Sequence, residues 1–157
     1  MNATALAPST PVIRAKADVR MATVRATGDP AVTGRSAAAT LYASVGGRGP
    51  LFARWPNAHL VAKSDWTGIW GLPLPEGEPR VIPGMEPVRV ETWTYGMVAE
   101  VVHVGAFATE PETIARLHRF IADQGYEIVG PHEEEYLTPP GASEQRTLIR
   151  YVVKKRG

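Results

Sequence analysis

The 157-residue sequence contains no cysteine, has almost no net charge and shows no long apolar run. Without cysteine there is no disulfide framework, no thiol nucleophile and no cysteine-based metal site. Lysine plus arginine total 17 against 16 for aspartate plus glutamate, so the formal charge of +1 gives no strong attraction to nucleic acid or an anionic membrane. No signal peptide is evident, and no apolar run approaches the roughly 20 residues of a membrane-spanning helix. We therefore expect a soluble, cytoplasmic protein that binds neither nucleic acid nor a membrane directly.

The length and composition fit an ordinary globular domain, because 44% of the residues are hydrophobic and 21% are charged. Residues 1–16 are rich in Ala, Ser, Thr and Pro and lack periodicity. Such a segment is typical of a disordered leader. We predict a single domain over residues 17–157.

The first half of the domain reads as a strand, a helix and short strands. Residues 18–26 alternate as a strand does, and Asp29 with Pro30 has the pattern of a helix N-cap and first helical residue. We expect this helix to end at Gly46. Proline is frequent over residues 48–87, so only short strands are expected there, within residues 51–55 and 59–74.

The second half gives clearer signals. Residues 88–105 predict a strand broken near Gly96. Thr109 followed by Glu112 matches a capping box, and apolar residues then recur at helical spacing up to Gly125. The segments that follow, residues 126–140 and 146–155, predict an antiparallel hairpin.

Both halves follow the order strand, helix, strand, strand. Aligning "MATVRATGDP" with "VAEVVHVGAF" places Gly28 on Gly105 and Val24 on Val101. The identity between the halves is slight, so coincidental periodicity is the alternative. We predict an α+β fold of two pseudo-repeated strand-helix-strand-strand units, with an antiparallel sheet, two helices and a ligand cleft.

The stretch "GPHEEEYL", residues 130–137, places three carboxylates in a row. On a strand, alternate side chains share a face, so His132, Glu134 and Tyr136 lie together and Glu133 and Glu135 lie on the other side. We expect Glu133 and Glu135 to face solvent. Glu134 lies either in a pocket or on an exposed edge.

Aromatic residues are the candidates for the lining of the cleft, and burial in the core is the alternative for each of them. The candidates are Tyr42, Trp66, Trp70, Trp93 and Tyr95. The four histidines are scattered without the spacing of metal ligands, and no phosphate-binding loop matches. We expect neither a metal nor a cofactor.

Three segments, "VVHVGAF", "FIADQGYEIVGPHEEEYLTPP" and "RTLIRYVVKK", cover roughly residues 97–155 and resemble the GyrI-like (gyrase-inhibitory-protein-like) domains. These domains also serve as effector-binding domains of multidrug-responsive bacterial transcription activators. The resemblance implies a pocket for hydrophobic, often cationic, aromatic molecules with a central glutamate. Glu134 corresponds to that glutamate, whereas Glu135 stands where the family commonly has an aliphatic residue. The first half fits only in its order of elements.

The leading prediction is the binding of lipophilic, aromatic or cationic small molecules, in drug or toxin sensing or sequestration. Its ligand-binding candidates are Glu134, Tyr136 and His132 with the five aromatic residues named above. Desolvation of Glu134 among aromatic side chains would favour a bound cation.

The alternative is an enzyme, because stand-alone members of the family resemble hydrolases that open the strained ring of cyclopropane-bearing DNA-alkylating compounds. Glu134 and Tyr136 are then the catalytic candidates, and burial would raise the pKa of Glu134 toward that of a general base. A third reading is a protein inhibitor that contacts a partner such as DNA gyrase. The sequence leaves open the ligand, the oligomeric state and whether a separate DNA-binding partner exists.

Overall fold

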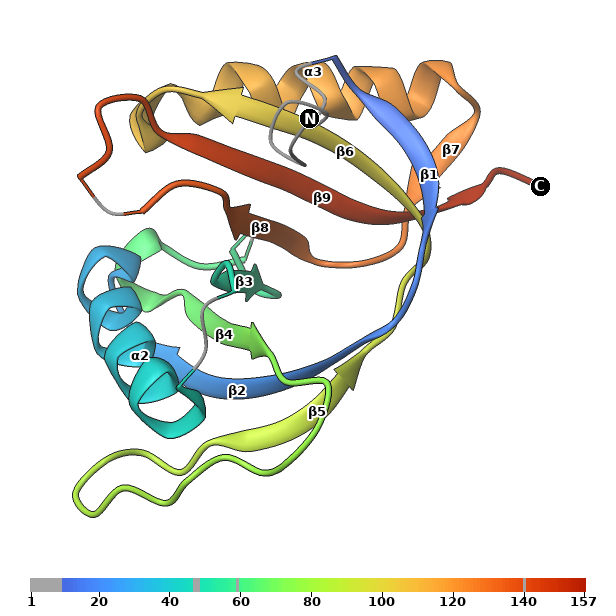
Figure 1. The fold of residues 1–157 in the computed structure, drawn as a ribbon. Coiled ribbons are helices and arrows are strands. Elements are labelled where there is room, and N and C mark those ends of the chain that lie inside the picture. Colours follow the sequence, from blue (N-terminus) through green and yellow to red (C-terminus); the bar gives the residue numbers. More distant parts are fainter. Residues whose placement is uncertain (1–9, 47–48, 59, 140) are drawn as a thin grey trace. The chain divides into compact units, whose positions relative to one another are not determined.

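The computed structural model describes residues 10–157 except 47, 48, 59 and 140, and these residues form an α+β fold (Figure 1). They divide into two compact units. Unit 1 comprises residues 10–16 and 95–157, and unit 2 comprises residues 17–94. Within the described ranges, neither helix has the length and apolar character needed to cross a bilayer.

Unit 2 has two helical segments and a four-stranded antiparallel sheet whose strand order is β3-β4-β2-β5. Its helix begins where the sequence predicts, since Asp29 caps it by accepting a hydrogen bond from the backbone N–H of Ala31 at 2.9 Å. The elements are β2 (Val19–Thr27), α2 (Pro30–Val45), β3 (Phe52–Trp55), the short 3₁₀ helix η1 (Lys63–Asp65), β4 (Thr67–Pro73) and β5 (Arg89–Trp93).

Unit 1 is also an antiparallel sheet, ordered β1-β6-β9-β8, with β7 on a further part of β9. The hairpin predicted for the C-terminal segments is confirmed by the pairing of β8 with β9. The elements are β1 (Val12–Lys16), β6 (Gly96–Val104), the 3₁₀ helix η2 (Phe107–Thr109), α3 (Glu110–Asp123), β7 (Tyr126–Ile128), β8 (His132–Tyr136) and β9 (Arg146–Lys155).

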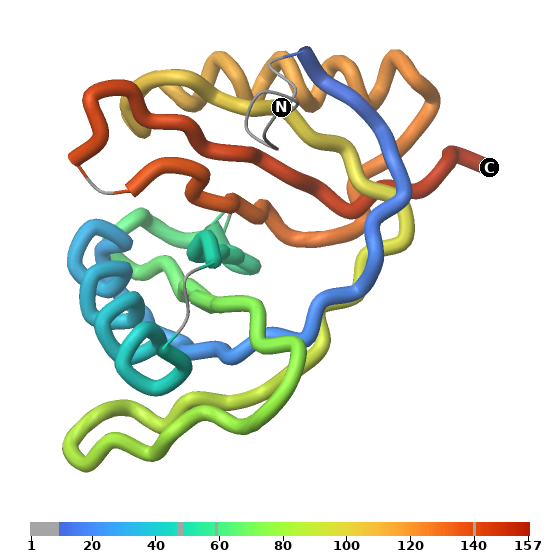
Figure 2. The backbone as a smooth tube through the Cα atoms, viewed as in Figure 1, coloured from blue at the N-terminus to red at the C-terminus, as the bar shows by residue number. Residues whose placement is uncertain are grey.

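The two units repeat one topology, which confirms the predicted pseudo-repeat. Each runs strand, helix, strand, strand, and each adds one further strand beside the first: β5 pairs with β2, and β1 pairs with β6. Gly28 and Gly105, aligned from the sequence, end the two first strands with φ of 141° and 125°. Residues with a Cβ rarely adopt these angles. The tube in Figure 2 shows the chain passing from β1 into β2 and later from β5 into β6.

The prediction of a disordered leader over residues 1–16 is wrong for residues 12–16. These residues form β1, in which Val12 lies opposite Glu100 and Lys16 opposite Gly96. Ile13 packs against the core of unit 1. A strand of this length takes its stability from the edge it pairs with rather than from its own composition, which is why composition misled the prediction. Residues 1–9 lie outside the described residues.

The strand expected within residues 59–74 starts later than predicted. Residues 63–65 form η1, Trp66 follows it, and β4 begins only at Thr67. Trp66 therefore does not share a strand with Trp70. His59 lies outside the described residues.

A helix covers one face of each sheet. In unit 1, Leu117 and Ile121 of α3 pack against apolar side chains of the central strands, which are Ala99, Val101, Ile149, Tyr151 and Val153. In unit 2, α2 lies so close to its sheet that a Cβ on Gly34 would be 2.7 Å from the Trp70 ring. The alanine-rich stripe of α2 makes this approach possible.

The face of the unit 1 sheet that lies opposite α3 holds a buried ionic network, which we call the Arg150 network. Arg150 is 1% exposed and donates to Glu100 and Glu133 at 2.6 Å each and to Glu135 at 2.9 Å. Arg14 of β1 donates from Nη2 to Glu100 Oε2 at 3.0 Å, the oxygen that also accepts from Arg150, and from Nε to Glu100 Oε1. Four neighbouring strands therefore contribute to one set of charge-assisted hydrogen bonds.

The Arg150 network corrects the expectation that Glu133 and Glu135 face solvent. Glu133 is only 2% exposed, and it also accepts a hydrogen bond from the Tyr95 hydroxyl at 2.9 Å. The cause is the register of the hairpin, in which Glu133 lies directly opposite Arg150. From the sequence alone, a run of three carboxylates predicts a solvated face, because the sequence does not reveal that Arg150 lies across from it.

We expect Arg150→Met to lower the free energy of unfolding by about 3–5 kcal/mol, because it leaves Glu133 buried without its cation and leaves Glu100 with Arg14 alone. Urea denaturation at pH 7 measures the change. Arg146→Met is the matched control, since its ion pair with Glu144 is largely exposed and the expected loss is below about 1 kcal/mol. A loss for Arg150→Met as small as that of the control would contradict a permanent ionic role for Arg150.

Candidate functional site

The residues His132, Glu134 and Tyr136 of β8 lie on the face of unit 1 that α3 covers. Glu134 is opposite Ile149 in the β8–β9 register, and Ile149 belongs to the core beneath α3. Directly opposite residues of antiparallel strands point to the same face. The three side chains share this face as the alternation predicts, and it is not the face of the Arg150 network.

Hydrogen bonds join these side chains to two further residues, Tyr151 and Glu110, and we call the five the Glu134 cluster. Glu134 is 5% exposed. Its Oε2 lies 2.7 Å from His132 Nε2, and its Oε1 accepts from the Tyr136 hydroxyl at 3.1 Å. The other ring nitrogen, His132 Nδ1, lies 2.7 Å from the Tyr151 hydroxyl. Glu110, the first residue of α3, adds a side-chain hydrogen bond to Glu134.

The pKa of Glu134 is lowered, not raised. Burial disfavours the charged form and pushes the pKa up, but the hydrogen bond and charge of His132, with the hydrogen bonds of Glu110 and Tyr136, bring it below its ordinary value. The expectation of a raised pKa is therefore wrong, because it counted burial without the donors. Glu134 is ionised at neutral pH.

The two tyrosines keep their protons. Burial raises the pKa of Tyr136 and of Tyr151, and the charge of Glu134 raises both further. Both hydroxyls therefore remain available as hydrogen-bond donors throughout the physiological pH range.

The counter-charge of Glu134 differs from that of the other buried glutamates. Glu100 and Glu133 pair with Arg150. In the part of the chain that the structure describes, the ion-pair partner of Glu134 is His132 and not a lysine or arginine. A buried carboxylate held by neutral donors alone carries a large desolvation cost. A positive charge beside the carboxylate offsets this cost more strongly than neutral donors do.

Partly exposed aromatic rings border the cluster. Phe107 is 50% exposed and meets Tyr136 edge to face, with ring centroids 5.9 Å apart. His118 of α3 and His132 both meet the Tyr151 ring, at 5.0 and 5.3 Å. Burial and the charge of His132 lower the pKa of His118. Of these rings, Phe107 and His118 are the exposed ones, and Tyr151 is buried.

The remaining aromatic candidates lie outside this cluster. Tyr95 is on the opposite face of unit 1, bonded to Glu133, with the Lys16 ammonium 4.9 Å from its ring centroid. The others belong to unit 2. Trp66 and Trp70 pack around Trp55, at centroid distances of 6.2 and 5.5 Å.

Trp93 and Tyr42 have different surroundings again. Trp93 is buried, holds the Arg54 guanidinium 4.1 Å from its ring centroid and donates from Nε1 to Glu91 at 3.0 Å. Tyr42 is exposed on α2, and its hydroxyl donates to the backbone oxygen of Gly49 at 3.4 Å. Both residues belong to unit 2, whereas Glu134 belongs to unit 1.

Sequence reasoning missed Tyr151, Glu110 and Phe107. The position of Tyr151 follows from the β8–β9 register, in which its neighbour Arg150 lies opposite Glu133, and no local pattern reveals that register. Glu110 and Phe107 lie beside Thr109, where the sequence predicts the start of a helix. Because the capping pattern already accounted for this segment, nothing in the sequence marked the two residues as part of a site. The cap itself differs from the prediction, because the Thr109 hydroxyl donates to the backbone oxygen of Ala106 at 2.8 Å.

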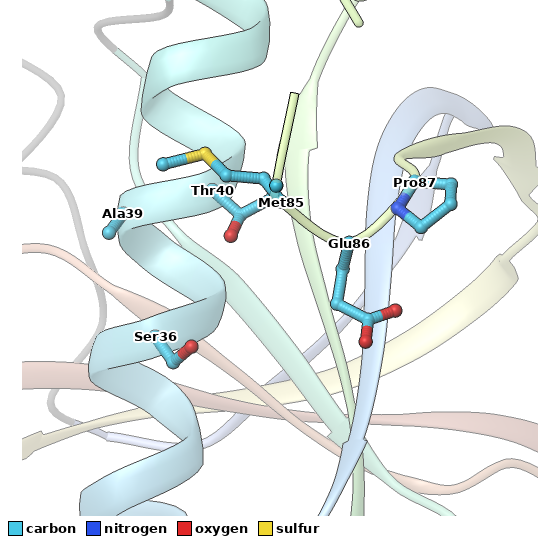
Figure 3. Close-up of a pocket in the computed structure, with 7 residues that line it drawn as sticks. Ser36, Ala39, Thr40, Met85, Glu86 and Pro87 are labelled. Atoms are coloured by element: carbon cyan, nitrogen blue, oxygen red, sulfur yellow. The ribbon is translucent and has the colours of Figure 1, made fainter. Parts of the chain in front are cut away.

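A cavity of about 420 Å³ lies in unit 2, between α2 and the loop before β5. Figure 3 shows Met85 extending from the loop toward Thr40 of the helix. The lining contains none of the predicted site residues; it consists of Ser36, Ala39, Thr40, Gly84, Met85, Glu86 and Pro87. Among the described residues, no group of three or more His, Asp or Glu side chains is placed to hold a metal ion.

No family model and no curated protein matches this sequence. Solved structures do match. An uncharacterized conserved protein from Listeria innocua superposes with a TM-score of 0.80 at 21% identity, with 94% of each chain covered. A hydrolase from Listeria innocua gives a TM-score of 0.77 at 19% identity over 94% of this chain and 93% of that one. The EcmrR C-terminal domain gives 0.67 at 13% identity over 94% and 98%.

At these identities the similarity defines the fold. It confirms the predicted α+β class, and the match to the EcmrR domain is consistent with the resemblance to GyrI-like and effector-binding domains. The chain therefore shares the fold of the two Listeria innocua proteins and of the EcmrR C-terminal domain.

We expect Tyr136→Phe to raise the pKa of Glu134 and to cost about 1.5–3 kcal/mol of stability at pH 7, because an ionised carboxylate loses a donor. A carboxylate whose pKa is lower in the folded state than in the unfolded state stabilises the fold at pH values above the unfolded-state pKa. This stabilisation is lost as the pH falls through the folded-state pKa. The cost should therefore shrink between pH 7 and pH 4 in urea denaturation.

Tyr126→Phe is the control, since Tyr126 is a half-buried tyrosine packed against the same core. It should change stability by less than about 0.5 kcal/mol at either pH. A Tyr136→Phe cost that is the same at pH 7 and pH 4 would contradict an ionised Glu134.

Proposed function

We propose that this protein binds small molecules that combine a positive charge with an apolar, aromatic body, and that Glu134 provides the counter-charge. The observation that carries the proposal is the buried, ionised Glu134 whose ion-pair partner is a histidine rather than a permanent cation. A cationic ligand would offset the desolvation of this carboxylate, and a neutral ligand would not.

The neighbouring rings suit the rest of such a ligand. Phe107, Tyr136 and His118 offer apolar surface, and aromatic faces attract cations by roughly 0.5–2 kcal/mol per contact. The resemblance to effector-binding domains supports a role in sensing or sequestering drugs or toxins, with the ligand rather than nucleic acid as the direct partner.

The test compares Glu134→Gln with the wild type in calorimetric titrations of two probes, tetraphenylphosphonium and the neutral triphenylphosphine oxide. We expect affinity for the cation to fall at least tenfold, which is about 1.4 kcal/mol. Affinity for the neutral probe should change less than twofold, because the substitution preserves shape and removes charge.

Glu112→Gln is the matched control, an exposed glutamate in the first turn of α3. It should leave both affinities unchanged. Equal losses for the two probes in Glu134→Gln, or no binding of the cation by the wild type, would refute Glu134 as the counter-charge.

The second candidate function is hydrolysis of an electrophile with a strained ring. It is favoured by the hydrogen-bonded series Tyr151, His132, Glu134 and by the similarity to the Listeria innocua hydrolase. Glu134 or His132 would accept a proton from a water molecule whose oxygen attacks a cyclopropane carbon. The electron pair of the broken ring bond would pass to an electron-withdrawing group of the compound, which takes up a proton, so the product gains one water in total. The lowered pKa of Glu134 makes it a weak base, so binding is the first proposal.

For this second function, incubation with a cyclopropane-bearing alkylator should yield a product heavier by one water, detected by mass spectrometry. We expect Glu134→Gln to slow its formation a hundredfold or more, the usual scale of a general base. Recovery of the compound intact after incubation with the wild type would exclude this hydrolysis and leave the binding function in place.

A further inference from the structure

His132 occupies the position where a cation would neutralise Glu134. An ionised carboxylate only accepts hydrogen bonds, so the contact of 2.7 Å requires a proton on His132 Nε2. The other nitrogen, Nδ1, faces the Tyr151 hydroxyl at 2.7 Å. That hydroxyl can donate to a neutral ring or accept from a protonated one. Both charge states of His132 therefore fit without loss of a hydrogen bond.

We propose that His132 is the exchangeable counter-cation of Glu134: it is protonated when the site is empty, and binding of a cationic ligand releases that proton. The inference rests on the function proposed above. It makes His132 the residue that sets how affinity for cations depends on pH, whereas Glu134 sets whether cations are preferred at all.

The surroundings of His132 favour this exchange. Its own strand presents the Glu134 carboxylate and the Tyr136 hydroxyl, and β9 presents the Tyr151 hydroxyl. Both tyrosines remain protonated, so neither adds charge. A ligand cation and a protonated His132 beside a single carboxylate would repel each other, which favours loss of the proton when the ligand binds.

Two side chains of α3, His118 and Glu110, are alternative sources of a proton released on ligand binding. His118 meets the same Tyr151 ring as His132, and burial with the charge of His132 lowers its pKa. Glu110 shares a hydrogen bond with Glu134, and a bond between two carboxyl groups requires a proton on one of them. Either group could release a proton on binding, so each needs its own variant.

The expected pH dependence has a definite sign. At a pH where His132 is protonated in the empty protein, the ligand must displace the proton, so affinity falls up to tenfold per pH unit of acidification. At higher pH His132 is neutral and affinity reaches a plateau. Titration of tetraphenylphosphonium between pH 5.5 and 8.5, in buffers of different ionisation enthalpy, measures both the affinity and the protons released.

His132→Gln is the decisive variant, because the amide can donate to Glu134 and accept from Tyr151 but does not titrate. We expect its affinity for the cation to be independent of pH between pH 5.5 and 8.5, with no proton release on binding. His118→Gln and Glu110→Gln, which replace the competing groups, should keep the pH dependence of the wild type.

A second measurement uses the unaltered protein. Nitrogen-detected NMR of the His132 ring at pH 6 should show conversion from the protonated to the neutral form when tetraphenylphosphonium is added. This readout holds even where His132→Gln does not fold.

The outcomes separate the two proposals. Cation binding by the wild type that does not vary with pH would overturn the role of His132 and leave the proposed function standing. Loss of the pH dependence in His118→Gln or Glu110→Gln, with His132→Gln unaffected, would also overturn it. Failure of the wild type to bind the cation at any pH would refute both.

Discussion

The buried guanidinium of Arg150 is the constraint on which unit 1 depends. It pairs with Glu100 of β6 and with Glu133 and Glu135 of β8, and Arg14 of β1 completes the set through Glu100. A slip of the hairpin by one residue would turn Arg150 toward the apolar face beneath α3 and leave its carboxylates unpaired. The network therefore fixes the register that places Glu134 on the opposite face.

That register gives one run of three glutamates two different kinds of chemistry. On the face of the Arg150 network, Glu133 and Glu135 are paired with an arginine that stays charged at any relevant pH. On the α3 face, Glu134 is held by a tyrosine and a histidine rather than by an arginine. The first arrangement stabilises the sheet, whereas the second is the basis of the proposed binding function.

Unit 2 repeats the topology without this chemistry. Val24 of β2 corresponds to Val101 of β6, so Trp70, paired with Val24, corresponds to Ile149. Ala53 lies opposite Trp70 as Glu134 lies opposite Ile149. Gly71 stands at the position of Arg150, and a Cβ there would lie 3.4 Å from the Trp93 ring. Aromatic packing in unit 2 thus takes the place of the ionic network and of the candidate site.

The sequence by itself determined the features that depend on neighbouring residues: the α+β repeat, the start of α2 at Asp29 and Pro30, and the shared face of His132, Glu134 and Tyr136. Capping and alternation are local, so a short stretch of sequence contains them. Only the tertiary structure decided that residues 12–16 form a strand, that Glu133 is buried, that Tyr151 joins the Glu134 cluster and that the pKa of Glu134 falls. Each of these depends on a partner far along the chain, and strand register, which local patterns do not encode, selects that partner.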